Sequence, residues 1–319
     1  MLHLRISVPA ALSDPVVAVL TESPAVSSLS LIRGASVRPA GDLIQADVAR
    51  EAADGVIEQL RAFGVHHEGT LQVVPVHTWV SQAGYDAERL APGSSSDSVV
   101  WAEVTQQAYG DSELTWTYLS FMCLATLIAA IAIVLDSQIL VIGAMVLGPE
   151  FGAVAALGIA LVRRRRRLFQ LATRTLLTGF ALAIGFTCAA SLLARALGWV
   201  TISDLTGPRP GTSFIYTPDK WSFIVALIAA AAGVLSLTSA RIGGLSGVFI
   251  SVTTVPAAGN VALGLAFGLR EEIWGSSLQL LLNLTGMALA GWATLLVQQA
   301  VWSRVSAGRS RWGARVRRR

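Results

Sequence analysis

Six long apolar segments limit what this chain can fold into more than any other feature of its sequence. They lie at residues 115–135, 138–162, 168–197, 221–239, 242–268 and 275–301. A helix needs about 20 apolar residues to cross the hydrocarbon core of a bilayer, and each segment comes close to or exceeds that length. Only 14% of the residues are charged, against about 25% in a typical soluble domain. The sequence therefore predicts a six-helix transmembrane domain over residues 114–302, embedded in the lipid bilayer.

The first 80 residues have a mixed composition and predict a separate soluble domain. Alternating apolar residues indicate strands near residues 2–8, 26–32, 43–49 and 71–76, and helical patterns cover residues 13–22 and 51–63. This β-α-β-β-α-β order is that of a ferredoxin-like α+β domain, in which two helices cover one face of a four-stranded antiparallel sheet. The fold serves many purposes, so both subunit assembly and ligand sensing remain open for it.

Two basic segments predict the orientation in the membrane. Arg163–Arg167 lies between the second and third apolar segments, and further arginines fill the tail at residues 303–319. The positive-inside rule places both in the cytoplasm, which agrees with the even number of spans between them. The N-terminus lacks the pattern of a secretory signal. We therefore expect a multi-pass protein of the cell (inner) membrane with both termini in the cytoplasm. Arg163–Arg167 serves as this topology signal or, alternatively, binds anionic lipid.

The stretch between the two domains, residues 81–113, has the composition of a linker. It contains the flexible run Pro92–Ser96 and ends with a short amphipathic helix near residues 99–109. We expect this segment to connect the cytoplasmic domain to the first span.

An internal repeat divides the membrane domain into two halves of three helices. Pro149–Ala155 matches Pro256–Ala262 at four of seven positions, and Leu177–Ala183 matches Leu284–Ala290 at six of seven. Both matches have the same offset, 107 residues, which indicates duplication. Because each unit has an odd number of spans, the two copies must cross the membrane in opposite directions. The sequence thus predicts a 3+3 inverted repeat, as in many secondary transporters.

A proline near the middle of the second and of the fifth segment marks the predicted site. Proline removes a backbone donor, so Pro149 and Pro256 are expected to break their helices near mid-bilayer, where transporters of this kind bind substrate. Packing kinks would explain the same prolines without a site. The candidate binding residues around the two breaks are Gly148, Pro149, Glu150, Gly152, Thr253, Thr254, Pro256, Gly259, Asn260 and Asn283.

Glu150 is the most informative candidate, because a carboxyl group in hydrocarbon is costly and usually faces a protein interior or a water-filled cavity. Protonation, cation binding, or an ion pair with Arg174 or Arg241 would each relieve that cost. A tilted helix that brings Glu150 nearer to the membrane surface would relieve it as well.

Three short motifs in the membrane domain carry a family resemblance. The first is Val141-Ile142-Gly143-Ala144-Met145 before Pro149, the second is Gly247–Pro256 with the small residues that follow, and the third is Asn283 between two leucines. Over about residues 110–300 the chain resembles a family of prokaryotic hydrophobic membrane proteins known as domain of unknown function 389. The resemblance implies a membrane location and this architecture, with no substrate attached. Glu150 departs from the apolar residue more usual there in the family.

Several function classes find no support in the sequence. The only lysine, Lys220, lies outside any phosphate-binding loop, and neither a zinc-protease nor a nucleophile-elbow motif is present. We therefore expect neither an ATP-driven pump nor an enzyme. The histidines and the two cysteines lack metal-ligand spacing, so neither a metal nor another cofactor is expected. The net charge is only +4, which argues against nucleic-acid binding.

Two functions remain. One is a secondary transporter or channel for a small solute or ion, with a midplane site between the broken second and fifth helices. The other is a non-transporting membrane sensor or scaffold whose cytoplasmic domain binds a ligand or partner. In either case we expect a homo-oligomer.

Overall fold

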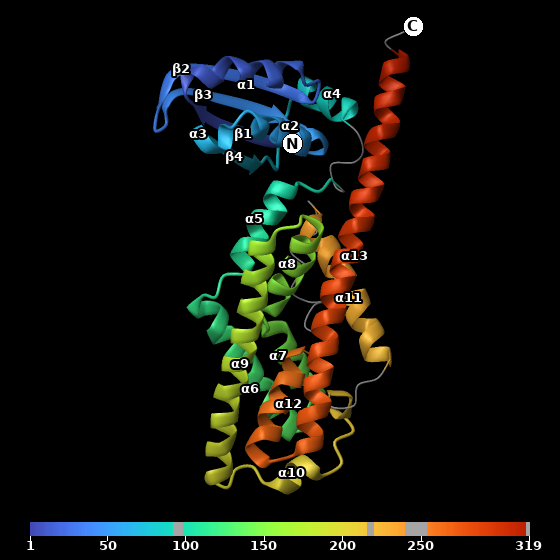
Figure 1. The fold of residues 1–319 in the computed structure, drawn as a ribbon. Coiled ribbons are helices and arrows are strands. Elements are labelled where there is room, and N and C mark those ends of the chain that lie inside the picture. The colour runs from blue at the N-terminus through green and yellow to red at the C-terminus, as the bar shows by residue number, and fades with distance from the viewer. Residues whose placement is uncertain (92–97, 216–219, 240–253, 317–319) are drawn as a thin grey trace. The chain divides into compact units, whose positions relative to one another are not determined.

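The computed structural model describes residues 1–91, 98–215, 220–239 and 254–316 (Figure 1). Side chains are described in the same ranges except at Ser222 and beyond residue 301. The chain divides into two compact units, the first built mainly from residues 1–104 and the second from residues 105–237 and 254–298.

The first unit is a small antiparallel sheet with helices. Its elements are β1 (Leu2–Val8), α1 (Ala10–Glu22), β2 (Val26–Val37), β3 (Ala40–Val48), α2 (Arg50–Ala62), α3 (Val65–Glu68), β4 (Thr70–Pro75) and α4 (Gln82–Leu90). The strand order is β2-β3-β1-β4, and every neighbouring pair is antiparallel. The small antiparallel sheet predicted from the sequence is thereby confirmed.

The alternating pattern of β1 explains where the core of this unit lies. Leu4 and Ile6 have no exposed surface, whereas Arg5 between them is exposed. Successive side chains of a strand point to opposite faces, so the apolar set gathers on one face of the sheet. Val56 and Leu60 of α2 are four residues apart, on one side of that helix, and join the same core.

The predicted linker is partly helical. Residues 82–90 form α4, which begins at Ser81, whose hydroxyl accepts a hydrogen bond from the backbone N–H of Gly84 at 3.2 Å. Serine is a favoured N-cap because its oxygen satisfies a helix N–H that would otherwise lack a partner. The prediction missed this cap because the run Pro92–Ser96 dominates the composition, and that run lies outside the described residues.

The second unit is helical. Following α5 (Trp101–Asp111), its elements are α6 (Trp116–Val134), α7 (Gln138–Leu147), α8 (Glu150–Val162), α9 (Arg166–Ala196), α10 (Ile202–Thr206), the 3-10 turn η1 (Ser213–Ile215), α11 (Lys220–Thr238), α12 (Thr254–Phe267) and α13 (Arg270–Val316) (Figure 1). Within it, α12 packs against α6, α7 and α9, and α8 packs against α9. Helix α13 runs on through residues 303–316, so that part of the predicted tail is helical.

Three helices are each long and apolar enough to cross a bilayer, at residues 116–134, 166–196 and 270–301. A fourth span results if α7 and α8 are counted together, since they form a pair bent by 55°. The remaining apolar helices, Phe223–Thr238 and Thr254–Phe267, are shorter, and residues 242–253 of the fifth predicted segment lie outside the described residues. The described parts of the chain therefore supply three or four spans where the sequence predicted six.

Glycines let the helices of this unit approach closely. A Cβ atom at Gly158 of α8 would lie 2.9 Å from the backbone nitrogen of Trp292 in α13. A Cβ at Gly259 of α12 would lie 3.0 Å from the Cβ of Ala129 in α6. Such small-residue contacts are typical of helix packing within membranes, where burial of apolar surface provides little drive for association.

Candidate binding site at the helix break

The break predicted in the second apolar segment is confirmed. Helix α7 ends at Leu147, helix α8 begins at Glu150, and Gly148 and Pro149 lie between them. Proline has no N–H to donate, so the hydrogen-bond ladder of α7 cannot run through it. Pro256 lies in α12, whose described part begins at Thr254, and residues 240–253 before it lie outside the described residues, so the second predicted break stays a prediction.

The carboxyl group of Glu150 lies at the point where α8 and α12 begin. Its side chain is only 1% exposed, and its Oε1 accepts a hydrogen bond of 2.5 Å from the hydroxyl of Thr254, the first residue of α12. The other oxygen, Oε2, has no hydrogen-bond partner among the residues that the structure describes. A buried carboxylate with one unsatisfied oxygen is energetically unfavourable. Binding of a proton or a cation at Oε2 would remove this cost.

Gly148 makes room for this carboxyl. A Cβ atom at that position would collide with Oε2 of Glu150 and would lie 2.8 Å from Cγ2 of Val255. The break between α7 and α8 and the described N-terminal end of α12 therefore meet at Glu150. The predicted partner Arg174 is exposed and forms no described ion pair with Glu150, and Arg241 and Thr253 lie outside the described residues.

Two of the predicted glycines serve packing away from this carboxyl. Gly259 contacts α6, as described above. Gly152 faces α5, where a Cβ atom would lie 2.8 Å from the Cβ of Asp111. Burial of Asp111 raises the pKa of its carboxyl group above the usual aspartate range. The glycine at position 152 thus allows a second acidic residue to approach α8.

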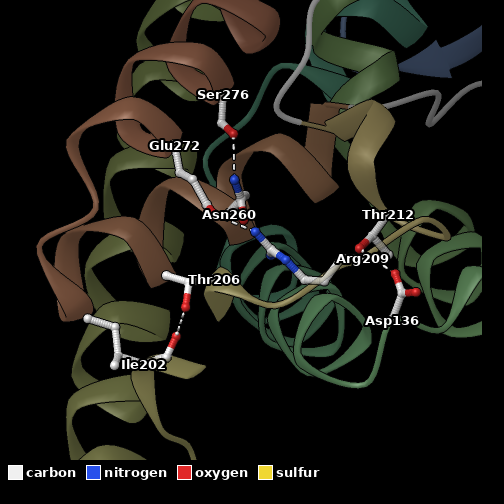
Figure 2. A network of polar contacts seen from close by, with 8 residues as sticks. All are labelled: Asp136, Ile202, Thr206, Arg209, Thr212, Asn260, Glu272 and Ser276. Carbon is white, nitrogen blue, oxygen red and sulfur yellow. Dashed lines mark hydrogen bonds and ion pairs between the residues drawn. The ribbon is translucent and has the colours of Figure 1, made fainter. Parts of the chain in front are cut away.

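The structure adds a row of polar residues on one face of α13. The members are Glu272, Ser276, Gln279 and Asn283, whose spacing of four, three and four residues places them along one side of a helix. Ser276, Gln279 and Asn283 are 0%, 2% and 1% exposed. Four residues of such spacing cover about 16 Å along the helix axis. Two of the predicted site residues join this row: Asn283 is one of its members, and Asn260 of α12 donates a hydrogen bond of 2.8 Å to the hydroxyl of Ser276 (Figure 2).

A buried ion pair lies at the α13 N-terminal end of this row. The guanidinium group of Arg209, in the loop between α10 and η1, contacts the carboxylate of Glu272 (Figure 2). The same loop is fixed by Asp136, which accepts hydrogen bonds from the backbone N–H of Gly211 at 3.1 Å and from the hydroxyl of Thr212 at 2.8 Å. This loop therefore closes over the end of the polar row.

Of the four residues in this row, only Asn283 was predicted for the site from the sequence. The signal for the row was present, since the polar residues of the last segment recur at helical spacing, but the predicted span began at residue 275 and excluded Glu272. The loop residue Arg209 gave no signal, because nothing local indicates that a residue 63 positions away will pair with it.

Comparison with known proteins finds one family whose model matches part of the chain. Residues 145–289 match the family described as domain of unknown function (DUF389). The resemblance predicted from the sequence is confirmed. The DUF389 match includes the break, Glu150, Thr254 and Asn260, and its name specifies no substrate. An uncharacterized protein of Methanocaldococcus jannaschii is 25% identical over 169 residues, which are 53% of this chain and 50% of that protein. The alignment thus spans about half the length of that relative. No solved structure matches the chain.

Proposed function

We propose that the membrane domain is a transporter or channel for a small ion or solute, and that Glu150 binds the cation or proton that moves or that couples to the movement. The observation that carries this proposal is the buried Glu150 carboxyl at a helix break, with Thr254 on one oxygen and no described partner on the other. A single carboxylate balances one positive charge, so the geometry favours a proton or a monovalent cation.

The polar row of α13 supports the same function. Leaving a buried polar group unsatisfied costs roughly 1–3 kcal/mol, and Gln279 Nε2 and Asn260 Oδ1 both lack a hydrogen-bond partner among the described residues. Packing alone would be served better by apolar side chains. Buried polar residues inside membrane domains commonly mark substrate or ion pathways. The row extends from Glu272 to Asn283, on the helix whose Ser276 bonds to α12.

Repeated packing supports the inverted repeat on which the transport hypothesis rests. A Cβ at Gly179 of α9 would lie 2.8 Å from the ring of Tyr118 in α6, and a Cβ at Gly286 of α13 would lie 2.7 Å from the ring of Phe223 in α11. The two glycines differ by the 107 residues of the sequence repeat, and each ring comes from the helix that begins its own half. We therefore propose that the two halves are structural copies in opposite orientation, as in many secondary transporters.

Flux measurements on the full chain in proteoliposomes test the proposal. We would impose Na⁺, K⁺ and pH gradients in turn and record ion movement with an entrapped pH dye and with membrane currents. Glu150→Gln and Asn260→Ala are expected to abolish the flux. Glu271→Gln is the matched control, since Glu271 is an exposed acidic residue at the start of α13. Flux that neither site variant changes would refute the assigned site.

The same preparation distinguishes the sensor hypothesis. If no gradient drives flux through the wild-type protein and ligand binding is confined to residues 1–80, the chain is a membrane sensor or scaffold. The transport proposal would then be wrong, although the fold and the buried carboxyl would be unchanged.

A further inference from the structure

An open pocket of about 610 Å³ lies at the start of α9, apart from the helix break. Its lining comes from Tyr109 of α5, from Glu113, and from four residues of α9: Arg167, Gln170, Leu171 and Arg174. The two arginines are seven residues apart, which places them on the same side of the helix with Gln170 between them.

The pocket carries unneutralised positive charge. Both arginines are exposed, and neither belongs to an ion pair among the described residues. Glu113 is the one carboxylate that lines the pocket, so two guanidinium groups face one negative charge. The four residues directly before Arg167 in the sequence, Arg163 to Arg166, are also arginines and add to the positive potential. The pocket therefore favours an anionic group.

An apolar groove continues the pocket along α9. This second cavity, of about 380 Å³, shares Gln170 and Arg174 with the pocket and extends past Phe169 and Thr173 to Leu177 and Thr178. Phe169 is 41% exposed and Leu177 is 68% exposed, within a helix that is long and apolar enough to span a bilayer. A ligand that fills both cavities must have an anionic end and an apolar chain.

We propose that these cavities bind an anionic phospholipid, with its phosphate group at Arg167 and Arg174 and an acyl chain along Phe169 and Leu177. Guanidinium groups bind phosphate oxygens through paired, charge-assisted hydrogen bonds, and the tyrosine and glutamine supply further donors. The cytoplasmic side predicted for the arginine run is also the side where anionic lipids attract basic residues. The proposal is independent of the transport function, because none of these residues contributes to the helix break.

Native mass spectrometry of the purified full chain in detergent tests the headgroup contact. Dioleoyl phosphatidylglycerol competes with dioleoyl phosphatidylcholine, and the ratio of retained lipids is measured. We expect the double variant Arg167→Gln/Arg174→Gln to lower the preference for phosphatidylglycerol about 30-fold, or about five-fold for each arginine. The control Arg164→Gln/Arg166→Gln removes the same charge from exposed residues that do not line the pocket. An equal loss in the control would overturn the proposal, because it would indicate long-range attraction only.

A second arm separates a lipid from a soluble phosphate compound. Phe169→Ala/Leu177→Ala removes apolar side chains that line the groove at two exposed positions. Retention of phosphatidylglycerol is expected to fall in this variant. If glycerol 3-phosphate binds as tightly as the lipid and the groove variant changes neither, the site takes a soluble anion and the lipid assignment is wrong. Thermal melting of each variant, expected to match the wild type, confirms that folding is preserved.

Discussion

The hydrogen bond between Thr254 and Glu150 provides the sharpest quantitative prediction. Both side chains are buried, and the hydroxyl of Thr254 is the one described donor to the Glu150 carboxyl. A buried hydrogen bond contributes about 0.5–1.5 kcal/mol when both partners are neutral and about 1.5–3 kcal/mol when one is charged. Thr254→Val keeps the side-chain shape and removes the donor. We therefore expect it to lower the free energy of unfolding by about 0.5–1.5 kcal/mol if the carboxyl is neutral and by about 1.5–3 kcal/mol if it is charged.

A double-mutant cycle isolates this contribution. Thr254→Val, Glu150→Leu and the double variant are unfolded by sodium dodecyl sulfate in mixed micelles, with tryptophan fluorescence as the signal. In the Glu150→Leu background the Thr254 substitution should cost little, which gives a coupling free energy of about 1 kcal/mol or more. Thr126→Val is the matched control, because the hydroxyl of Thr126 is equally buried but donates to the carbonyl of Met122 in its own helix at 2.7 Å.

A small coupling free energy in this cycle would refute the prediction. Independent sites add within about 0.3–0.5 kcal/mol, so a coupling of that size between Thr254 and Glu150, no larger than that of the Thr126 control, would mean that the two side chains do not interact. The meeting of α8 and α12 at Glu150 would then be wrong, and with it the proposed site.

Three further predictions concern packing, pH and the buried ion pair, all measured by the same unfolding assay. Gly259→Ala should destabilise the protein by about 1–3 kcal/mol, since its Cβ would lie 3.0–3.2 Å from atoms of α6, whereas Gly185→Ala, with nothing within 4 Å, should not; equal effects would contradict the packing. Because burial raises the pKa of Asp111, the contribution of Asp111 to the free energy of unfolding should be largest below about pH 4 and should decline as the pH rises through the raised pKa. Asp111→Asn should remove this pH dependence. Arg209→Met should cost about 3–5 kcal/mol by leaving Glu272 buried without this partner, and Arg209→Met/Glu272→Leu should recover most of the loss; no recovery would mean that the pair is not the cause.

The features that the sequence predicted are those set by local patterns. The strand β1 follows from the alternation of apolar residues, because a sheet face must be covered. The break at Pro149 follows from the chemistry of one residue, which cannot donate a backbone hydrogen bond in any environment. Both results depend on neighbours in the sequence, and both agree with the structure.

The features that the sequence missed depend on contacts between distant segments. Charge arguments offered Arg174 or Arg241 as a partner of Glu150. Arg174 forms no described ion pair with it and Arg241 lies outside the described residues, whereas Thr254, predicted for the site without a specific partner, donates a hydrogen bond that lowers the cost of burying the carboxyl. The pairing of Arg209 with Glu272 depends on how a loop folds over a helix end, which residue spacing does not specify.

The distribution of polar and apolar side chains in the second unit is the reverse of that in a soluble protein. Leu177, Leu193 and Val297 are 68%, 61% and 63% exposed, while Gln279 and Asn283 are almost completely buried. This arrangement is unfavourable in water and suits lipid, where exposed leucine costs nothing. In lipid the helices associate through close packing and interhelical hydrogen bonds, and the glycines of α8 and α12 allow the close packing. The buried polar atoms without a described hydrogen-bond partner, Glu150 Oε2, Gln279 Nε2 and Asn260 Oδ1, add nothing to this association, and they are the observation that supports the proposed pathway for an ion or polar solute.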